Sequence, residues 1–134
     1  ALWHHLIMKF VFCIFLFINF QTMAKQLSEL SWKKRLLIVS YNQKEDQLLT
    51  RAKEFISINK CELEDRNLEI IFYEKFKNKK FTTPKFLDNK YGIWLIGYDG
   101  NIKDYSSDDK IFFRLFNLID SMPMRKSEIE KDTC

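Results

Sequence analysis

The chain has 134 residues, of which 22 are Lys or Arg and 18 are Asp or Glu. This length predicts a single domain and excludes a two-domain enzyme with an interdomain cleft. Aromatic residues make up 16% of the chain, with only three Gly and two Pro, which excludes a disordered or collagen-like protein.

The first 24 residues predict a secretory signal peptide. Met8 and a lysine precede an apolar run over 10–20, and the small residues Thr22 and Ala24 follow. A basic start, a short apolar centre and small residues at the cleavage site are typical of export signals. A membrane span needs about 20 apolar residues; an uncleaved anchor is the alternative. We expect an exported protein, periplasmic or secreted, that starts at Met8 and keeps no stable membrane span after cleavage; residues 1–7 are then translated upstream sequence.

Removal of this segment takes both histidines with it and leaves 110 residues with a net charge of +3. A mature chain without histidine builds no Ser-His-Asp or Cys-His site and lacks the commonest transition-metal ligand. We therefore expect no metal and no cofactor. Thiols outside the cytosol tend to oxidise. The two remaining cysteines either form an intramolecular disulfide, Cys61 to Cys134, or stay a semi-buried Cys61 and a free terminal thiol.

Strand and helix patterns then alternate. Apolar runs over 36–41 and 68–73 predict two buried strands. Apolar residues at helical spacing between them predict a helix up to about residue 58, begun by a capping box of Asn42 and Glu45. A charged turn over 62–67 leads into the second strand. The unit is typical of a right-handed βαβ crossover with parallel strands.

A basic, irregular stretch over 75–90 follows, in which six lysines alternate with Phe76, Phe81 and Phe86. Such residues can bind phosphates and stack on bases. Because exported proteins rarely meet nucleic acid, we expect no nucleic-acid partner and favour a solvated loop whose Phe side chains dock on the sheet. Attachment to acidic glycans or anionic envelope lipids is an intermediate interpretation.

The remaining chain predicts a β-hairpin and a last helix. Strands over 91–98 and 101–105 flank Asp99-Gly100, a pair typical of a two-residue type I′ turn. Ser107 can cap a helix that Pro123 stops.

The order of these elements defines the expected fold and domain. It predicts an α/β, thioredoxin-like architecture, β-α-β followed by a β-hairpin and a C-terminal helix, with helices on both faces of a mixed sheet. The domain covers 25–128, after the signal region 1–24 and before a polar tail, 129–134.

Four pieces of sequence carry a resemblance to a known family. They are residues 32–35, residues 64–66, the hairpin motif 95–100 with Lys103, and Asp120 with the Met-Pro-Met-Arg ending at 122–125. Over about 27–128 the chain resembles the peroxiredoxin-like domain of unknown function of small exported bacterial proteins and of sushi-repeat and equarin-type extracellular-matrix proteins. The resemblance implies a thioredoxin-like fold and secretion, with no established reaction. Family members commonly carry Lys where this chain has Tyr98.

The usual thioredoxin-like redox site is empty. Such proteins place a reactive cysteine after the first strand, at a helix N-terminus that lowers its pKa. Residues 41–44 of this chain contain none. We therefore expect no enzyme at that site. Cys61 is interpreted as structural, and weak thiol-redox activity through Cys61 is the alternative function.

Candidate binding residues come from the strand ends and the two motifs: Arg35, Arg66, Gly97, Asp99, Gly100, Lys103, Asp120, Met122, Pro123, Met124 and Arg125. The first two arginines either orient an anion at the carboxyl edge of the sheet or cap loops. The last arginine pairs with Asp120 or a helix C-terminal carbonyl, and the two methionines fill gaps. We expect a non-catalytic module that binds an envelope or extracellular protein or an acidic glycan.

Overall fold

A computed structural model describes residues 3, 25–26, 33–43, 46–74, 81–82, 85–87, 90–129 and 134. The predicted signal peptide and its upstream residues, 1–24, lie outside these residues apart from Trp3, and so does most of the basic stretch 75–90. Within the described ranges, no helix has the length and apolar content needed to cross a membrane.

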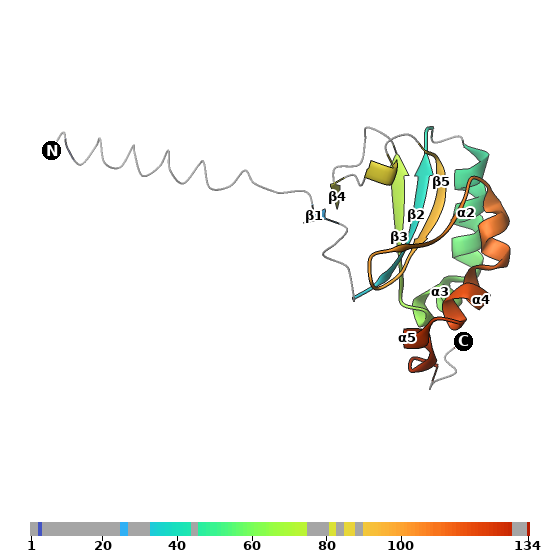
Figure 1. The fold of residues 1–134 in the computed structure, drawn as a ribbon. Helices are drawn as coiled ribbons and strands as arrows, with labels where there is room; N and C mark the ends of the chain where they lie inside the picture. Colours follow the sequence, from blue (N-terminus) through green and yellow to red (C-terminus); the bar gives the residue numbers. More distant parts are fainter. Residues whose placement is uncertain are drawn as a thin grey trace.

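A four-stranded mixed sheet forms the centre of the fold, in the order β3-β2-β5-β6 (Figure 1). Strand β2 is parallel to β3 and antiparallel to β5, which is antiparallel to β6. A separate two-residue ladder joins β1 and β4. The strands are β1 (Lys25–Gln26), β2 (Arg35–Tyr41), β3 (Leu68–Glu74), β4 (Phe81–Thr82), β5 (Gly92–Ile96) and β6 (Ile102–Ser106). The parallel pair confirms the predicted βαβ unit, and the sheet is consistent with a thioredoxin-like arrangement.

The α-helices gather on one side of the sheet. Helices α2 and α4 cover one face, and α3 and α5 lie at its lower end in Figure 1. The helical segments are α2 (Gln47–Ile58), α3 (Lys60–Asp65), the 3₁₀ helices η2 (Lys85–Leu87) and η3 (Asp109–Phe113), α4 (Leu115–Asp120) and α5 (Pro123–Lys126).

Two apolar clusters fill the two faces of the sheet, because successive strand residues point to opposite sides. Leu37, Val39 and Leu95 face α2 and α4, whereas Ile38 and Trp94 face the other side. Each fully buried large apolar side chain contributes about 1.5–3 kcal/mol to the stability of the folded state, so the clusters on both faces stabilise the domain.

The second face is covered by η2. Leu87 is buried there, and the Phe86 ring lies 5.6 Å from the Trp94 ring. The predicted α/β fold with a mixed sheet is confirmed, but the two predicted helices pack on the same face, and the second face is covered by the 3₁₀ helix η2. The predicted docking of Phe side chains from the basic stretch is confirmed for Phe86; Phe76 lies outside the described residues.

Both predicted helix caps are wrong. The carboxylate of Asp46, not Asn42, accepts a hydrogen bond from the amide of Leu48 at 2.9 Å and begins α2. Asp108, not Ser107, begins η3 in the same way. In both places the carboxylate one to four residues further along reaches the free amides of the first turn.

The regions after these helices also differ from expectation. The predicted charged turn over 62–67 is largely helix α3. The predicted last helix is divided into η3 and α4, and Pro123 both follows α4 and occupies the first turn of α5, a position that tolerates its missing N–H.

The hairpin loop has three residues rather than two. Gly97 donates its amide to the carbonyl of Asn101 at 3.0 Å, and Gly100 donates to Gly97 at 3.0 Å. Gly100 has a φ of 79°, whereas Asp99 does not have a positive φ. The prediction of a type I′ turn is therefore wrong. The connection is instead a turn that ends at Gly100, whose backbone adopts the left-handed conformation.

Candidate functional site

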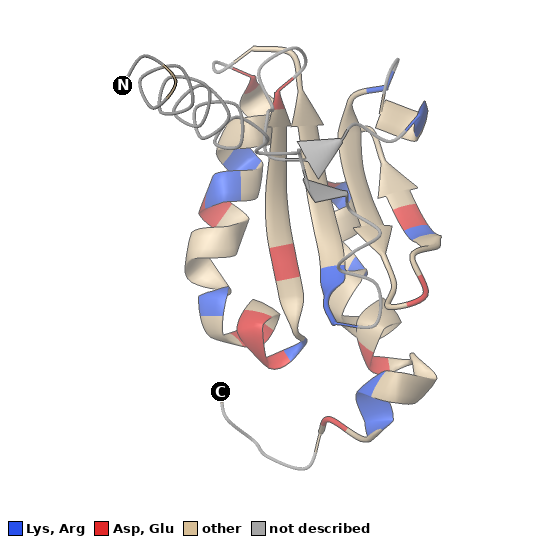
Figure 2. Cartoon of the chain, turned by 90° about the vertical axis from the view of Figure 1, so that its left-hand side faces the viewer, with Lys and Arg blue, Asp and Glu red and all other residues tan. Residues whose placement is uncertain are grey.

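Three buried arginines lie at the amino ends of β2 and β3. Arg35 begins β2, Arg66 follows α3, and Arg125 belongs to α5; their exposed fractions are 0%, 7% and 3%. Figure 2 shows positions of both charge signs around this end of the molecule. Burial of a guanidinium is costly unless it is paired. We call these arginines and their carboxylate partners the arginine cluster: Arg35, Arg66, Arg125, Glu62, Asp65, Asp120 and Glu128.

Arg66 joins α3 to the end of α4. Its Nε and Nη2 donate to the two oxygens of Asp120 at 3.1 and 2.9 Å, a bidentate pair. Its Nη1 donates to the side chain and the carbonyl of Glu62 at 2.6 and 2.9 Å. Burial alone would lower the Arg66 pKa, but the hydrogen bonds that Arg66 donates to Asp120 and Glu62 outweigh it and raise this pKa.

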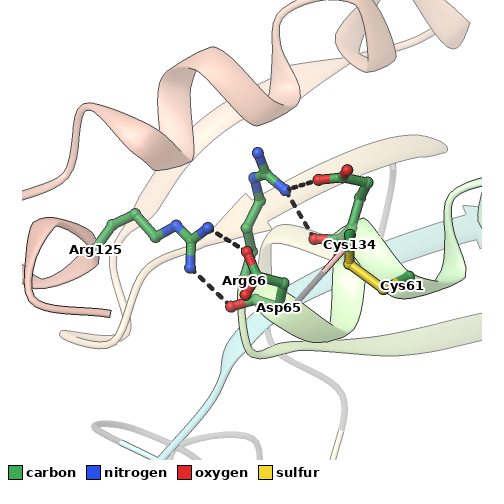
Figure 3. Close-up of a disulfide and its surroundings, with 6 residues drawn as sticks. Cys61, Asp65, Arg66, Arg125 and Cys134 are labelled. Atoms are coloured by element: carbon green, nitrogen blue, oxygen red, sulfur yellow. Dashed lines mark hydrogen bonds and ion pairs between the residues drawn. A yellow bond between two sulfur atoms is a disulfide. The ribbon is translucent and has the colours of Figure 1, made fainter. Parts of the chain in front are cut away.

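Arg125 joins α5 to α3. Its Nη1 donates to the carbonyl of Asp65 at 2.8 Å, and its Nη2 donates to the Asp65 carboxylate at 2.5 Å (Figure 3). Its Nε donates to Asp120 at 3.1 Å. Both predicted partners of Arg125, Asp120 and a helix C-terminal carbonyl, are therefore confirmed. Burial would raise the pKa of Asp120, but its bonds with the two arginines lower it.

Arg35 is the innermost member. Its Nη1 donates to the carbonyl of Arg66 at 2.8 Å, to Glu128 at 2.9 Å and to the hydroxyl of Tyr98 at 3.3 Å. The guanidinium carbon lies 4.2 Å from the centre of the Tyr98 ring. Among the described residues, none accepts a hydrogen bond from Nε or Nη2 of Arg35, although both atoms are buried.

Tyr98 ties Arg35 to the C-terminal tail. Its hydroxyl donates to Glu128 at 2.6 Å and accepts from the amide of Asn67 at 2.9 Å. Burial and the bond to Glu128 raise the Tyr98 pKa. Burial would raise the Glu128 pKa as well, but Arg35 and Tyr98 lower it. The tyrosine therefore stays neutral and the carboxylate charged over a wide pH range.

A disulfide lies beside the arginine cluster. Cys61 of α3 is bonded to Cys134, with the two Cα atoms 5.9 Å apart (Figure 3). Of the two alternatives, the intramolecular bridge is confirmed, and the semi-buried Cys61 with a free terminal thiol is wrong. Both cysteines are exposed.

The two sequence motifs meet at one cavity of about 280 Å³. We call it the motif cavity; it is lined by Arg35, Gly97, Tyr98, Asp99, Lys103, Met122, Pro123 and Met124. Lys103 donates to Asp99 at 2.8 Å, and this bond, together with those from Asn101, lowers the Asp99 pKa to about 2. Seven of the eleven candidate binding residues therefore surround one space, although they come from a strand start, a hairpin and a helix junction.

Other candidates lie elsewhere. Arg66, Asp120 and Arg125 belong to the arginine cluster, and Gly100 closes the hairpin turn. The predicted gap-filling role is wrong for Met124, which is 50% exposed, and right for Met122, which packs against the core.

The predicted position at the carboxyl edge is wrong for the arginines. Arg35 is the first residue of β2 and Arg66 precedes β3, so both lie at the amino end of the parallel pair. The loop-capping alternative is confirmed, since Arg35 binds the carbonyl of Arg66 and Arg66 binds that of Glu62.

Sequence reasoning missed several members of this region. Glu62, Asp65, Tyr98 and Glu128 were not among the candidates. Recognition of α3 as a helix would have placed Glu62 four residues before Arg66, on the same helical face. In the part of the chain that the structure describes, no group of three His, Cys, Asp or Glu side chains is arranged to hold a metal ion.

The fold and this site define a class: a small α/β domain with a buried arginine cluster beside a motif-lined cavity. The chain belongs to the family described as a domain of unknown function (DUF4174), whose sequence model matches residues 26–128. Neither the curated proteins nor the solved structures give a match. The matched range contains the arginine cluster and the motif cavity, whereas Cys134 lies beyond it.

Proposed function

We propose that the protein is an exported, non-catalytic thioredoxin-like domain that binds an envelope or extracellular partner at the motif cavity. One observation carries the proposal: residues from both sequence motifs and the buried Arg35 line the same cavity. The partner classes that fit an exported domain are a protein or an acidic glycan.

The arginine cluster supports this role by holding the cavity walls. Arg66 and Arg125 both bind Asp120, and Arg125 also binds Asp65. These bonds fix the junction of α4 and α5, which carries Met122 to Met124, against the start of the sheet. A wall held by several buried hydrogen bonds is preorganised for binding, because little freedom remains to be lost.

Catalysis finds little support in the described residues. At the carboxyl end of β2, where a thioredoxin-like enzyme keeps its thiol, the described residues are Tyr41, Asn42 and Gln43. The carboxylates near the cavity are engaged: Asp99 by Lys103, and Glu128 by Arg35 and Tyr98. Their lowered pKa values oppose a role as general acid near neutral pH.

Site-specific photo-cross-linking tests the binding site. A photoreactive residue replaces Met124 of the cavity wall, and a matched control replaces Ile129; these side chains are 50% and 51% exposed. We expect envelope extracts to yield a discrete adduct from position 124 and none from position 129. Equal adducts from both positions, or none from position 124, would contradict the proposal. Buried Arg66 and Arg125 are unsuitable, because their loss perturbs folding.

Export is tested separately. Expression of the full chain, cell fractionation and N-terminal sequencing of the product should give an exported protein that begins at Lys25. A cytosolic product that retains residues 8–24 would contradict export.

The exposed disulfide favours thiol–disulfide exchange as a second candidate function. A thiolate of a partner dithiol would attack one sulfur of Cys61–Cys134 and release the other as thiolate. The second partner thiol would then resolve the mixed disulfide, leaving the partner oxidised and this chain reduced. Oxidation of a reduced dithiol substrate by wild type and Cys61→Ser, together with insulin-reduction and peroxide-consumption assays of the reverse, thiol-driven activity, decides this candidate. Absence of activity in wild type, or activity that survives the substitution, rules it out.

A further inference from the structure

We infer that the motif cavity binds a peptide segment of its partner, and that Nε and Nη2 of Arg35 donate to a main-chain carbonyl oxygen of that segment. This inference rests on the proposed binding function and names its ligand chemistry. Of the two partner classes proposed above, it favours a protein over an acidic glycan.

The first step is the unmet hydrogen-bonding capacity of Arg35. The side chain is fully buried, its Nη1 already binds three oxygens, and no described residue accepts from Nε or Nη2. Buried polar atoms in native proteins almost always have a partner, and an unpaired donor costs more than a made bond gains. Arg35 also lines the motif cavity, so a ligand that enters it and displaces a neighbouring side chain would offer these buried donors an acceptor.

The second step is geometry. In a planar guanidinium, the N–H groups of Nε and of one Nη point the same way and form a fork. Tyr98 stacks on the guanidinium, and Glu128 and the Arg66 carbonyl hold Nη1. Three contacts therefore fix the plane of the group. The fork is preset for one oxygen-bearing group, either a carbonyl or a carboxylate.

The third step is charge, which separates these two groups. The arginine cluster contains three guanidinium groups and four carboxylates, so it has one more negative charge than positive. Glu128 already neutralises Arg35 at Nη1, and Lys103 is paired with Asp99. A further carboxylate would be buried without a free positive partner. A neutral carbonyl oxygen satisfies the donors without this cost.

The fourth step is size and polarity. Met122, Pro123 and Met124 give the cavity an apolar wall, and methionine adapts to irregular side chains. The volume of about 280 Å³ is near the lower end of the range of about 300–1,000 Å³ for small-molecule sites. One apolar amino-acid residue with its flanking peptide group matches both properties. An acidic sugar matches neither the wall nor the charge.

A matched pair of probes tests the inference. N-acetyl-leucinamide and N-acetyl-leucine differ mainly in an amide against a carboxylate. The readout is the side-chain Nε–H signal of Arg35 in ¹H–¹⁵N NMR spectra. We expect this signal to shift saturably with the amide, and about tenfold more weakly with the acid. The exposed Arg51 and Arg114 serve as internal controls and should not shift.

Variants show whether the shift comes from the cavity. A Cβ at Gly97 would lie 2.6 Å from the flexible end of Lys103, so Gly97→Ala narrows the cavity without a backbone clash. We expect Gly97→Ala and Met124→Ala to weaken amide binding about tenfold, whereas Ile129→Ala leaves it unchanged. Arg35→Lys keeps the charge and removes the fork, and should abolish the amide preference; if it does not fold, Gly97→Ala decides.

Each failure has its own meaning. Equal or tighter binding of the acid overturns the carbonyl assignment while the motif cavity remains the binding site. No Arg35 shift with either probe overturns the inference; the proposed function then stands only if cross-linking at position 124 persists. Equal shifts of Arg35, Arg51 and Arg114 indicate non-specific binding and also overturn it.

Discussion

The two ends of the sheet differ in kind. At the carboxyl end of β2, where α/β proteins usually bind ligands, the described residues are Tyr41, Asn42 and Gln43, the last two exposed. At the amino end lie the arginine cluster, the disulfide and the motif cavity. The polar groups with defined geometry thus occur opposite the conventional site. The lack of a cysteine at the carboxyl end of β2 is therefore compatible with a candidate site, the motif cavity, at the amino end.

The largest expected effect at the amino end comes from the disulfide. Closing a loop between residues 73 apart restricts the unfolded chain, so Cys134→Ser should lower the free energy of unfolding by about 4 kcal/mol. Urea unfolding of wild type and variant measures the change. Reductant should lower wild-type stability similarly and leave Cys134→Ser unaltered. A change below about 1 kcal/mol would show that the bridge is peripheral to stability.

Loss of one arginine should be nearly as costly. Arg125→Ala leaves Asp65 and Asp120 without that partner, and breaking a buried ion pair typically costs about 3–5 kcal/mol. Because both carboxylates are partly exposed, we expect about 3 kcal/mol. Asn42→Ala at the carboxyl end should change stability by less than about 0.5 kcal/mol. Similar losses in urea unfolding would remove the difference between the two ends.

The carboxyl end should depend on helix capping rather than on ion pairs. Asp46→Ala removes the bond to the Leu48 amide, which should cost about 1 kcal/mol. Asp46→Asn keeps an acceptor oxygen and should retain most of the stability in thermal unfolding. If Asp46→Asn destabilises as much as Asp46→Ala, the carboxylate has a role beyond capping.

The smallest effect concerns the exposed pair at the rim of the motif cavity. Lys103→Met removes the main cause of the lowered Asp99 pKa, which should rise from about 2 towards 3.8. Because a lowered folded-state pKa favours the folded state above pH 3.8, the wild-type contribution disappears as pH falls from 3.8 towards 2. A carboxyl ¹³C NMR titration of Asp99 measures the change. An unaltered pKa would mean that the Asn101 amide alone holds the carboxylate.

The fold was largely predictable, because its main signals are local. The apolar runs that form β2 and β3, and the Asp-Gly pair in the hairpin, stand in the sequence as contiguous patterns. Helix α3 was missed because it has six residues and a single buried one, Leu63. The hairpin loop gained a residue because Gly100 alone adopts positive φ, while Asp99 accepts from the Asn101 amide.

The candidate site was predictable only in part. The motif residues were recognised, and most of them line one cavity. Their arrangement could not be predicted, since Arg35 and Glu128 are 93 positions apart and Arg125 and Asp65 are 60 apart. Such pairs depend on the strand order and on the position of helix α5. Neither can be predicted from the periodicity of apolar residues in the sequence. The absence of a described acceptor for Nε and Nη2 of Arg35 likewise depends on the three-dimensional arrangement of the surrounding residues.

The position of Arg35 at the start of β2 has a dynamic consequence. All seven residues of β2 are buried, and Leu36 to Ser40 pair with strands on both sides. The amides of this strand should therefore exchange with solvent only through opening of the whole domain, and rank among the slowest in hydrogen-exchange experiments. Because the Nε and Nη2 atoms of Arg35 are buried, a ligand oxygen reaches them only after a neighbouring cavity side chain moves. Association should therefore be slower than the range of about 10⁵–10⁷ M⁻¹s⁻¹ that is typical of rigid docking.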